Sequence, residues 1–174
     1  MFSTLLVHHN CTNIVHKINN AQILCLDKRI SMRDTLKVGL THQHSFRVST
    51  QQTVPNLYPE SELFLDMPHV FATGYMVGLL EWACIELLRD HMDWPNEQTL
   101  GTHVNFSHEA PTLPGATVVV NVELTKIQGR TLTFSVEAHD GLDTISRGTH
   151  ERVVIFRERF IEKLKMRQTK YESN

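Results

Sequence analysis

The chain has 174 residues, of which 41% are hydrophobic, so it is long enough for one compact domain with a hydrophobic core. Its 17 basic and 19 acidic residues nearly balance, which leaves no overall field to favour nucleic acid or an anionic membrane as a partner. No apolar stretch is long enough to cross a bilayer, and the three cysteines have none of the spacings typical of a zinc site or a disulfide framework.

Residues 1–31 differ in character from the remainder of the chain. The first 26 residues contain no Asp or Glu, which is one mark of an organellar transit peptide, but Lys17 is their only basic residue. We expect an N-terminal extension that is either disordered or a targeting segment, with translation from Met32 as the alternative. The protein would be cytoplasmic, or mitochondrial if this segment is a transit peptide.

The first half of the remaining chain predicts a strand, a loop and a helix. Phe46 alternates with polar neighbours in the predicted strand Thr41–Val54. Three prolines then predict a loop over Pro55–Pro68. Phe71–Met92 is helical in pattern and apolar nearly all round, so other structure must cover it on several sides.

The second half has the pattern of strands without intervening helices. Apolar residues alternate with polar ones, and turn residues occur at Gln128-Gly129 and Asp140-Gly141. The predicted strands are Leu100–Ala110, Thr117–Thr125, Leu132–Ala138 and Thr144–Phe156. A charged tail, helical or frayed, follows from Arg157 to Lys170. This order predicts an α+β fold in which an antiparallel sheet of about five strands wraps round one long central helix, the hot-dog fold.

Two residues of the predicted helix are candidates for chemistry. Glu81 lies between Leu80 and Trp82, where a carboxylate is costly to bury alone, and desolvation would raise its pKa toward that of a general base. The alternative is a Glu at the helix edge that reaches solvent or an arginine across an interface. Thr73 stands at the helix start, where it is either an N-cap or a functional hydroxyl that holds a carbonyl beside free amides or acts as a nucleophile.

The spacing of Thr73 and Glu81 bears on how a site is assembled. Eight helical residues separate them by about 12 Å along the axis, too far for both to touch one small group. Either Thr73 sits on a turn that folds back, or two chains build the site together. We favour a homodimer.

Several histidines are weaker candidates. His103 and His108 both fall in the predicted strand Leu100–Ala110, where a spacing of five sends them to opposite faces. His108 is either structural or a group that orients a hydroxyl and moves a proton. His42 and His44 alternate on one strand face, but no third ligand accompanies them, so no metal site is predicted.

Arg147 and Arg152 in the last strand are candidates for contacts with the phosphates of a nucleotide-like ligand, or for ordinary ion pairs.

The segment VFATGYMVGLLEWAC, residues 70–84, strongly resembles the fluoroacetyl-CoA thioesterase family. Shorter segments resemble it in the same order, namely Leu57–Ser61, Leu100–Thr102, Ala138–Gly141 and Gly148–Arg152. The likeness runs from about Met32 to the early 160s. It implies that residues 32–174 are a dimeric hot-dog thioesterase domain that hydrolyses a small acyl-CoA, with coenzyme A as part of the substrate and no other cofactor.

The same resemblance assigns site residues. The family's catalytic Thr, Glu and His fall on Thr73, Glu81 and His108. Substrate-binding positions fall on Gly74, Phe64, Met67 and Arg152. Met67 departs from the family, which has a second Phe there as a lid tied to fluorine recognition. The resemblance therefore predicts thioester hydrolysis and leaves open whether fluoroacetyl-CoA is a substrate.

Two other functions fit the same scaffold. One is a hot-dog hydratase or dehydratase acting on the acyl chain, although no DxNPxH-like segment is present. The other is a non-catalytic acyl-CoA-binding protein, against which the joint presence of Thr73, Glu81 and His108 argues.

Overall fold

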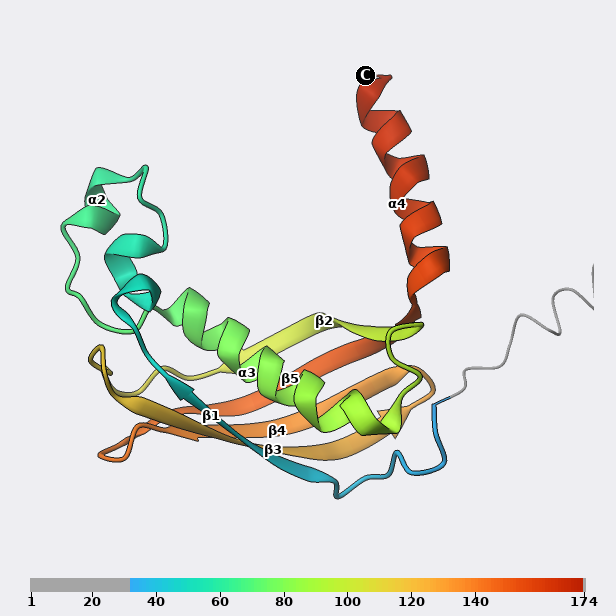
Figure 1. Ribbon diagram of the computed structural model, residues 1–174, viewed down its shortest axis with the longest axis horizontal. Helices are drawn as coiled ribbons and strands as arrows, with labels where there is room; N and C mark the ends of the chain where they lie inside the picture. Colours follow the sequence, from blue (N-terminus) through green and yellow to red (C-terminus); the bar gives the residue numbers. More distant parts are fainter. Residues whose placement is uncertain (1–31, 174) are drawn as a thin grey trace, which may run out of the picture. The chain divides into compact units, whose positions relative to one another are not determined.

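The computed structural model describes residues 32–173, which form an α+β fold with five antiparallel strands and one long helix against them (Figure 1). The predicted extension over residues 1–31 lies outside the described residues. The strands are β1 (Thr41–Arg47), β2 (Glu97–Phe106), β3 (Thr117–Gln128), β4 (Thr131–His139) and β5 (Thr144–Phe156). The helices are α2 (Glu62–Leu65), α3 (Thr73–Leu88) and α4 (Arg157–Glu172), with short 3-10 turns at Thr50–Gln52, Val54–Asn56 and Arg89–His91.

The strands follow the order β1-β3-β4-β5-β2 in a single sheet. Strands β3, β4 and β5 are sequential antiparallel neighbours, whereas β1 and β2 form the two edges. In the edge pair, Glu97 lies opposite Phe156 and Phe106 lies opposite Gly148. The register between β2 and β5 shifts between Gly101 and His103. This irregularity lies beside the centre of the candidate site.

The core lies between the sheet and α3. Period-two alternation directs one face of β3 and β4 to the helix, as predicted. The buried residues of these two strands are Val118, Val120, Val122, Leu124, Leu132, Phe134, Val136 and Ala138. They meet the buried side of α3, which carries Met76, Leu79, Leu80, Ala83, Cys84, Leu87 and Leu88.

The other side of α3 is open. Gly74, Gly78 and Trp82 are exposed, and Glu81 between them is only partly covered. The sheet therefore covers one side of a helix that is apolar nearly all round. None of the helices in residues 32–173 combines the length and apolar character needed to cross a membrane.

Several predicted boundaries were wrong. The first strand ends at Arg47, and the following residues form 3-10 turns. The proline-rich loop contains α2, and the long helix ends at Leu88 rather than Met92. Strand β2 begins at Glu97 and ends at Phe106, so His108 lies beyond the strand and its predicted strand face does not exist. The pattern misled because this edge strand is exposed along most of its length and lacks a regular apolar alternation.

Candidate active site

The start of α3 brings Thr73 and His108 together. Ala72 is the N-cap and makes no side-chain cap, and Thr73 is the first helical residue. The capping role considered for Thr73 is therefore wrong. Its hydroxyl oxygen lies 2.8 Å from Nδ1 of His108. A hydroxyl within hydrogen-bond reach of an imidazole is the arrangement of an activated nucleophile or a positioned polar anchor.

His108 is set up to accept a proton. Burial lowers the pKa of His108, and a hydrogen bond to the backbone of Ala110 opposes that shift in part. A neutral ring with its proton on Nε2 accepts the Thr73 hydroxyl proton at Nδ1. Beside this pair, the first amides of α3 have no intrahelical partner, and no acidic residue lies in the first turn. This helix end can therefore stabilise a developing oxyanion.

A second polar cluster surrounds Glu81 in the middle of α3. Its carboxylate oxygens lie 3.5 Å from Nη1 of Arg152 and 3.5 Å from Nε2 of His150. A Cβ at Gly101 would lie 2.5 Å from Oε1 of Glu81, so only glycine leaves room for the carboxylate there. The side chain of Glu81 remains 34% exposed, so the full desolvation expected from the sequence is not reached within one chain.

Buried hydrogen bonds fix Arg152 and His150. Arg152 donates from Nε to the Thr99 hydroxyl and from Nη2 to the Thr99 carbonyl. Nδ1 of His150 lies 2.8 Å from the His103 carbonyl, which assigns the ring proton to Nδ1 and leaves Nε2 to accept from Nη1 of Arg152 at 2.9 Å. Burial lowers the pKa of His150, and the neighbouring guanidinium adds to that shift. A neutral His150 thus holds Arg152 against Glu81.

Both arginine candidates are engaged within the chain. Arg152 is buried, donates hydrogen bonds to Thr99 and His150, and lies beside Glu81. Its guanidinium is therefore bound within the chain rather than exposed for contact with a phosphate. Arg147 forms an ion pair with Glu109 at 3.0 Å.

The sequence predictions missed Gly101, His150 and Thr99. The sequence did hold a signal for His150. It lies two residues before Arg152 and four before Val154, so period two places all three on the same, inward face of β5.

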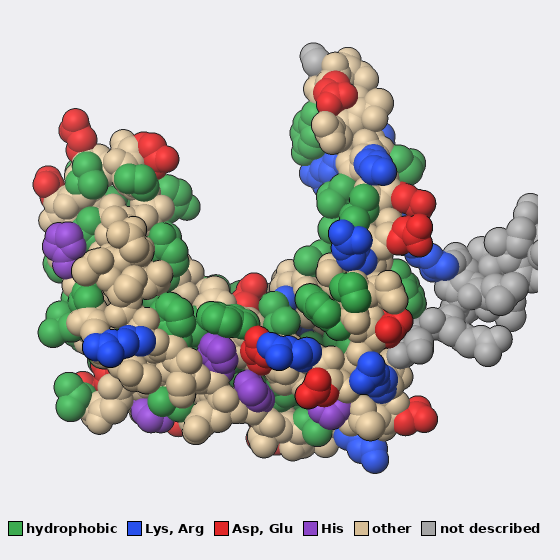
Figure 2. All heavy atoms as spheres, viewed as in Figure 1, with side chains coloured by type: hydrophobic (Ala, Val, Ile, Leu, Met, Phe, Trp, Pro, Cys, Tyr) green, Lys and Arg blue, Asp and Glu red, His purple; other side chains and the backbone are tan. Residues whose placement is uncertain are grey.

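The segment before α3 forms a lobe around α2 (Figure 1). The ring of Phe64 packs edge-on against that of Tyr58 at 5.1 Å, whereas Met67 is 49% exposed. Leu63 and Leu65 are exposed as well, and Figure 2 shows hydrophobic side chains gathered on this lobe. The lobe adjoins the Thr73 end of α3 and offers apolar surface there.

Within residues 32–173 no three His, Cys, Asp or Glu side chains are grouped as a metal site would require. His42 and His44 are separated by 6.3 Å between ring centroids, and the His44 ring packs 4.4 Å from that of Trp82. These histidines therefore take part in a surface aromatic cluster.

The site thus consists of two pairs. The structure brings Thr73 to His108 and Glu81 to Arg152, but the two pairs lie about two helical turns apart along α3.

Similar architectures are found among solved structures. A hot-dog-like protein from Thermanaerovibrio acidaminovorans is 20% identical with a TM-score of 0.64, and the match covers 76% of this chain and 93% of that protein. A thioesterase superfamily member from Thermus thermophilus is 25% identical with a TM-score of 0.72, and the match covers 82% of this chain and 100% of that protein. The fold is therefore the predicted hot-dog fold.

Closer similarity narrows this class. The model of the fluoroacetyl-CoA-specific thioesterase family matches residues 48–158. The fluoroacetyl-CoA thioesterase of Streptantibioticus cattleyicolor is 47% identical over 136 residues, which are 78% of this chain and 97% of that protein. A crystal structure of the fluoroacetyl-CoA thioesterase FlK has a TM-score of 0.74 at 47% identity, and the match covers 76% of this chain and 98% of that one. The chain belongs to the fluoroacetyl-CoA-specific thioesterase family, and the predicted acyl-CoA thioesterase activity is confirmed by this membership.

Proposed function

We propose that the enzyme hydrolyses a small acyl-CoA at a site built by two chains, with Thr73 and His108 from one chain and Glu81 from the other. The observation that carries this proposal is the Thr73–His108 hydrogen bond at the uncapped start of α3. It joins a hydroxyl, a proton acceptor and free amides at one point. A thioester carbonyl needs such groups as charge develops on its oxygen.

An exposed edge supports the homodimer. Within residues 32–173, strand β2 pairs with β5 alone, and its residues from Leu100 to Asn105 are exposed in succession. Exposed strand edges are commonly covered by pairing with another chain. The edge is continuous with the open side of α3, because Gly101 lies against Glu81. Two-fold pairing through β2 would cover both surfaces and bring a second α3 beside the first.

In the proposed reaction, the carbonyl oxygen of the thioester faces the amides near Gly74. Glu81 either attacks the carbonyl carbon or takes a proton from an attacking water. On the direct route the C–S bond then breaks, CoA takes a proton and leaves as the thiol, and the acyl group leaves as the free acid. On the covalent route the acyl group is first transferred to Glu81 as a mixed anhydride, or to Thr73 as an ester, and a water molecule then hydrolyses that bond to release the acid and restore the side chain. Thr73 positions the carbonyl or attacks it, while His108 orients Thr73 and assists proton transfer to the leaving sulfur. This chemistry uses side chains and water, with no cofactor besides the CoA of the substrate.

The acyl pocket is proposed to lie under the α2 lobe, with Phe64 and Met67 as its apolar cover. Met67 is a flexible side chain in place of a rigid ring, so it closes over different small acyl groups with little selection for fluorine. We therefore expect acetyl-CoA and fluoroacetyl-CoA to be hydrolysed with similar efficiency, and Met67→Phe to favour fluoroacetyl-CoA.

Thiol release from a panel of acyl-CoAs tests the activity. Glu81→Gln and His108→Ala are each expected to lower kcat by about 10²- to 10⁴-fold, because each removes a group that moves a proton. The matched control is Glu86→Gln, on the same helix, where the carboxylate bonds to Trp82 and Arg89. Full turnover by Glu81→Gln would refute the proposed mechanism.

Mixing the two inactive variants tests the shared site. Half of the dimers in an equal mixture carry one chain of each variant, and one of their two sites has all its groups intact, so about one quarter of the normal activity should return. A site contained in one chain would give no recovery.

We also propose that residues 1–31 are an extension to a catalytic domain of residues 32–174, in the cytoplasm, or in mitochondria if the extension is a transit peptide. Microscopy of the chain fused to a fluorescent protein, with and without residues 1–31, distinguishes the two locations.

A further inference from the structure

Helix α4 has an unusual relation to the domain. It runs for 16 residues from the end of β5, contains no buried residue, and projects on the side of the sheet where α3 and the α2 lobe lie (Figure 1). Its first amide is fixed to the start of β2, where Arg157 donates to the Asn96 carbonyl. An isolated helix of this length is marginally stable in water. A ligand or partner bound along α4 would therefore stabilise the helix.

The charge of α4 is concentrated on one face. The helix has six basic and three acidic residues in a chain whose net charge is −2. At 100° per residue, Lys163, Arg167 and Lys170 fall within an arc of about 60°, whereas Glu158, Glu172 and Lys165 fall on the opposite face and Glu162 lies between the two. The distribution creates a strip of positive charge that faces away from Glu158 and Glu172.

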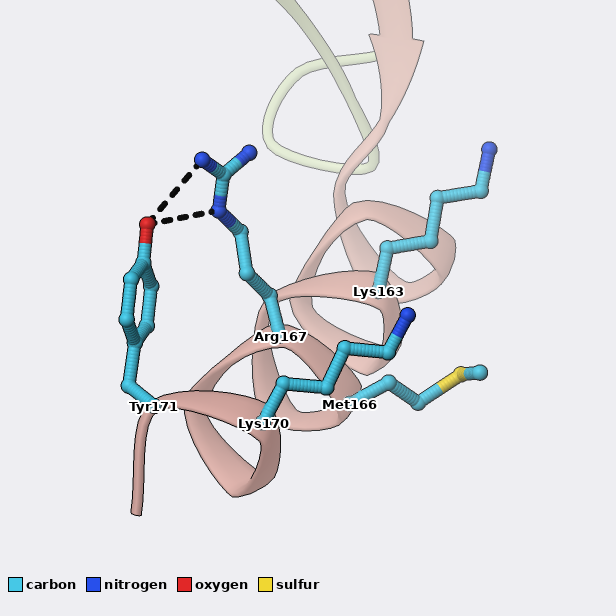
Figure 3. A pocket seen from close by; sticks show the side chains of 5 residues that line it. All are labelled: Lys163, Met166, Arg167, Lys170 and Tyr171. Carbon is cyan, nitrogen blue, oxygen red and sulfur yellow. Dashed lines mark hydrogen bonds between the residues drawn. The ribbon is translucent and has the colours of Figure 1, made fainter. Parts of the chain in front are cut away.

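This basic strip lies along an open surface pocket that α4 forms by itself. A space of about 450 Å³ is lined by Lys163, Met166, Arg167, Lys170 and Tyr171 (Figure 3). Arg167 donates to the Tyr171 hydroxyl at 3.0 and 3.2 Å and lies 5.7 Å from the centre of its ring. Among the described side chains, Lys163 and Lys170 have no carboxylate within ion-pair distance. The lining thus offers two amino groups, a held guanidinium and an aromatic ring.

In the proposed dimer, this strip lies near the reaction site of the other chain. The exposed run of β2 is centred near His103, so a two-fold axis there sets the partner's Glu97 opposite the end of this β2, near His108. The partner's α4 then rises beside the Thr73–His108 pair. Within one chain, by contrast, the ten-residue β2 separates the two by about 33 Å.

We propose that Lys163, Arg167 and Lys170 bind the phosphates of the CoA whose acyl group is held at Thr73 and His108 of the partner subunit. The proposal rests on the proposed shared site. CoA carries a diphosphate and a 3′-phosphate, joined to the thioester by the pantetheine arm, and the basic strip begins about 9 Å along α4 from Arg157. The three residues lie beyond residue 158, where the match to the family model ends.

The test compares two substrates with the same acyl group, one on CoA and one on N-acetylcysteamine, which has no phosphate. Lys163→Glu and Lys170→Glu in the full chain are each expected to raise KM for the acyl-CoA about 5- to 10-fold, less so at high salt, because reversing a charge turns attraction into repulsion. Their kinetics on the N-acetylcysteamine thioester should be unchanged. Lys165→Glu makes the same change on the opposite face and should leave both substrates within about twofold.

Equal effects on both substrates, or equal effects of Lys165→Glu, would overturn the proposal. So would dissociation of the dimer by the variants, or their selective loss of binding to anionic lipid vesicles with CoA kinetics intact. Calorimetry with CoA itself separates this proposal from the catalytic one. If no thioester is hydrolysed, weaker CoA binding by Lys163→Glu but not by Lys165→Glu still supports the phosphate site, and unchanged binding refutes it.

Discussion

Gly101→Ala is expected to lower turnover while leaving folding stability nearly unchanged. The new Cβ would lie 2.5 Å from Oε1 of Glu81 and 3.1 Å from Cε1 of His150, so the mobile carboxylate must retreat by about 1 Å to reach an ordinary contact distance. A misplacement of about 1 Å lowers turnover by about 100-fold when the displaced group takes part in the chemistry. Gly101 has no positive φ, so alanine fits its backbone. The gain of about 0.4–1 kcal/mol from fewer unfolded conformations is offset by the tight contact with the fixed His150 ring, so the free energy of unfolding should change by less than about 1 kcal/mol.

Thiol release and urea denaturation of the same preparations check this expectation. Thr102→Ala is the control on the same strand, since it changes the same edge without approaching Glu81. Sedimentation of both variants checks that the change leaves the proposed association through this edge intact. Full activity of Gly101→Ala with unchanged stability would refute the idea that the position of the Glu81 carboxylate matters. If Gly101→Ala does not fold, the new Cβ meets groups that cannot move aside, rather than a side chain that can.

Three further outcomes are expected. Burial lowers the pKa of His150 below its ordinary 6.5, so its contribution to stability is full above that pH and is lost as pH falls through the lowered pKa. His150→Gln keeps a donor and an acceptor without titrating, and its urea midpoint should fall less between pH ~7.5 and ~5. Burial raises the pKa of Cys84 to about 12, so peptide mapping after iodoacetamide treatment should find it alkylated only in unfolded protein. Phe134→Ala should lower the free energy of unfolding by about 3–5 kcal/mol, whereas exposed Leu63→Ala should change it by less than about 0.5 kcal/mol.

The central strands were predictable because their burial follows period two. Apolar residues occupy every second position of β3 and β4, and β5 was predicted with both ends correct. Helix α2 was not predictable, since four residues between prolines leave no helical period to detect. The bounds of β2 failed for a related reason, because an edge strand with most side chains exposed lacks the alternation that burial imposes.

The sequence predicted candidate residues for the site but not their contacts. Thr73, Glu81 and His108 follow from the family resemblance and the apolar context of the helix, and His108 proved to lie beyond its strand while still meeting Thr73. The buried bonds of Arg152 depend on the register of β2 against β5, which pairing at a bulge determines and which no local pattern encodes. For that reason an arginine considered for phosphate contacts proved to be fixed inside the domain, whereas the basic strip of α4 went unnoticed within a charged tail.

The two halves of the site differ in how they depend on assembly. The Thr73–His108 pair is complete within one chain, with its hydrogen bond formed and the helix amides free. Glu81 has its cationic neighbour Arg152 already buried and oriented, but its own side chain still reaches solvent. Covering the open side of α3 with a second chain would remove water from Glu81 and strengthen its interaction with Arg152, because the local dielectric falls. Association of two chains as proposed would therefore complete the site electrostatically as well as spatially, so a variant that prevents this association should lose activity while each chain remains folded.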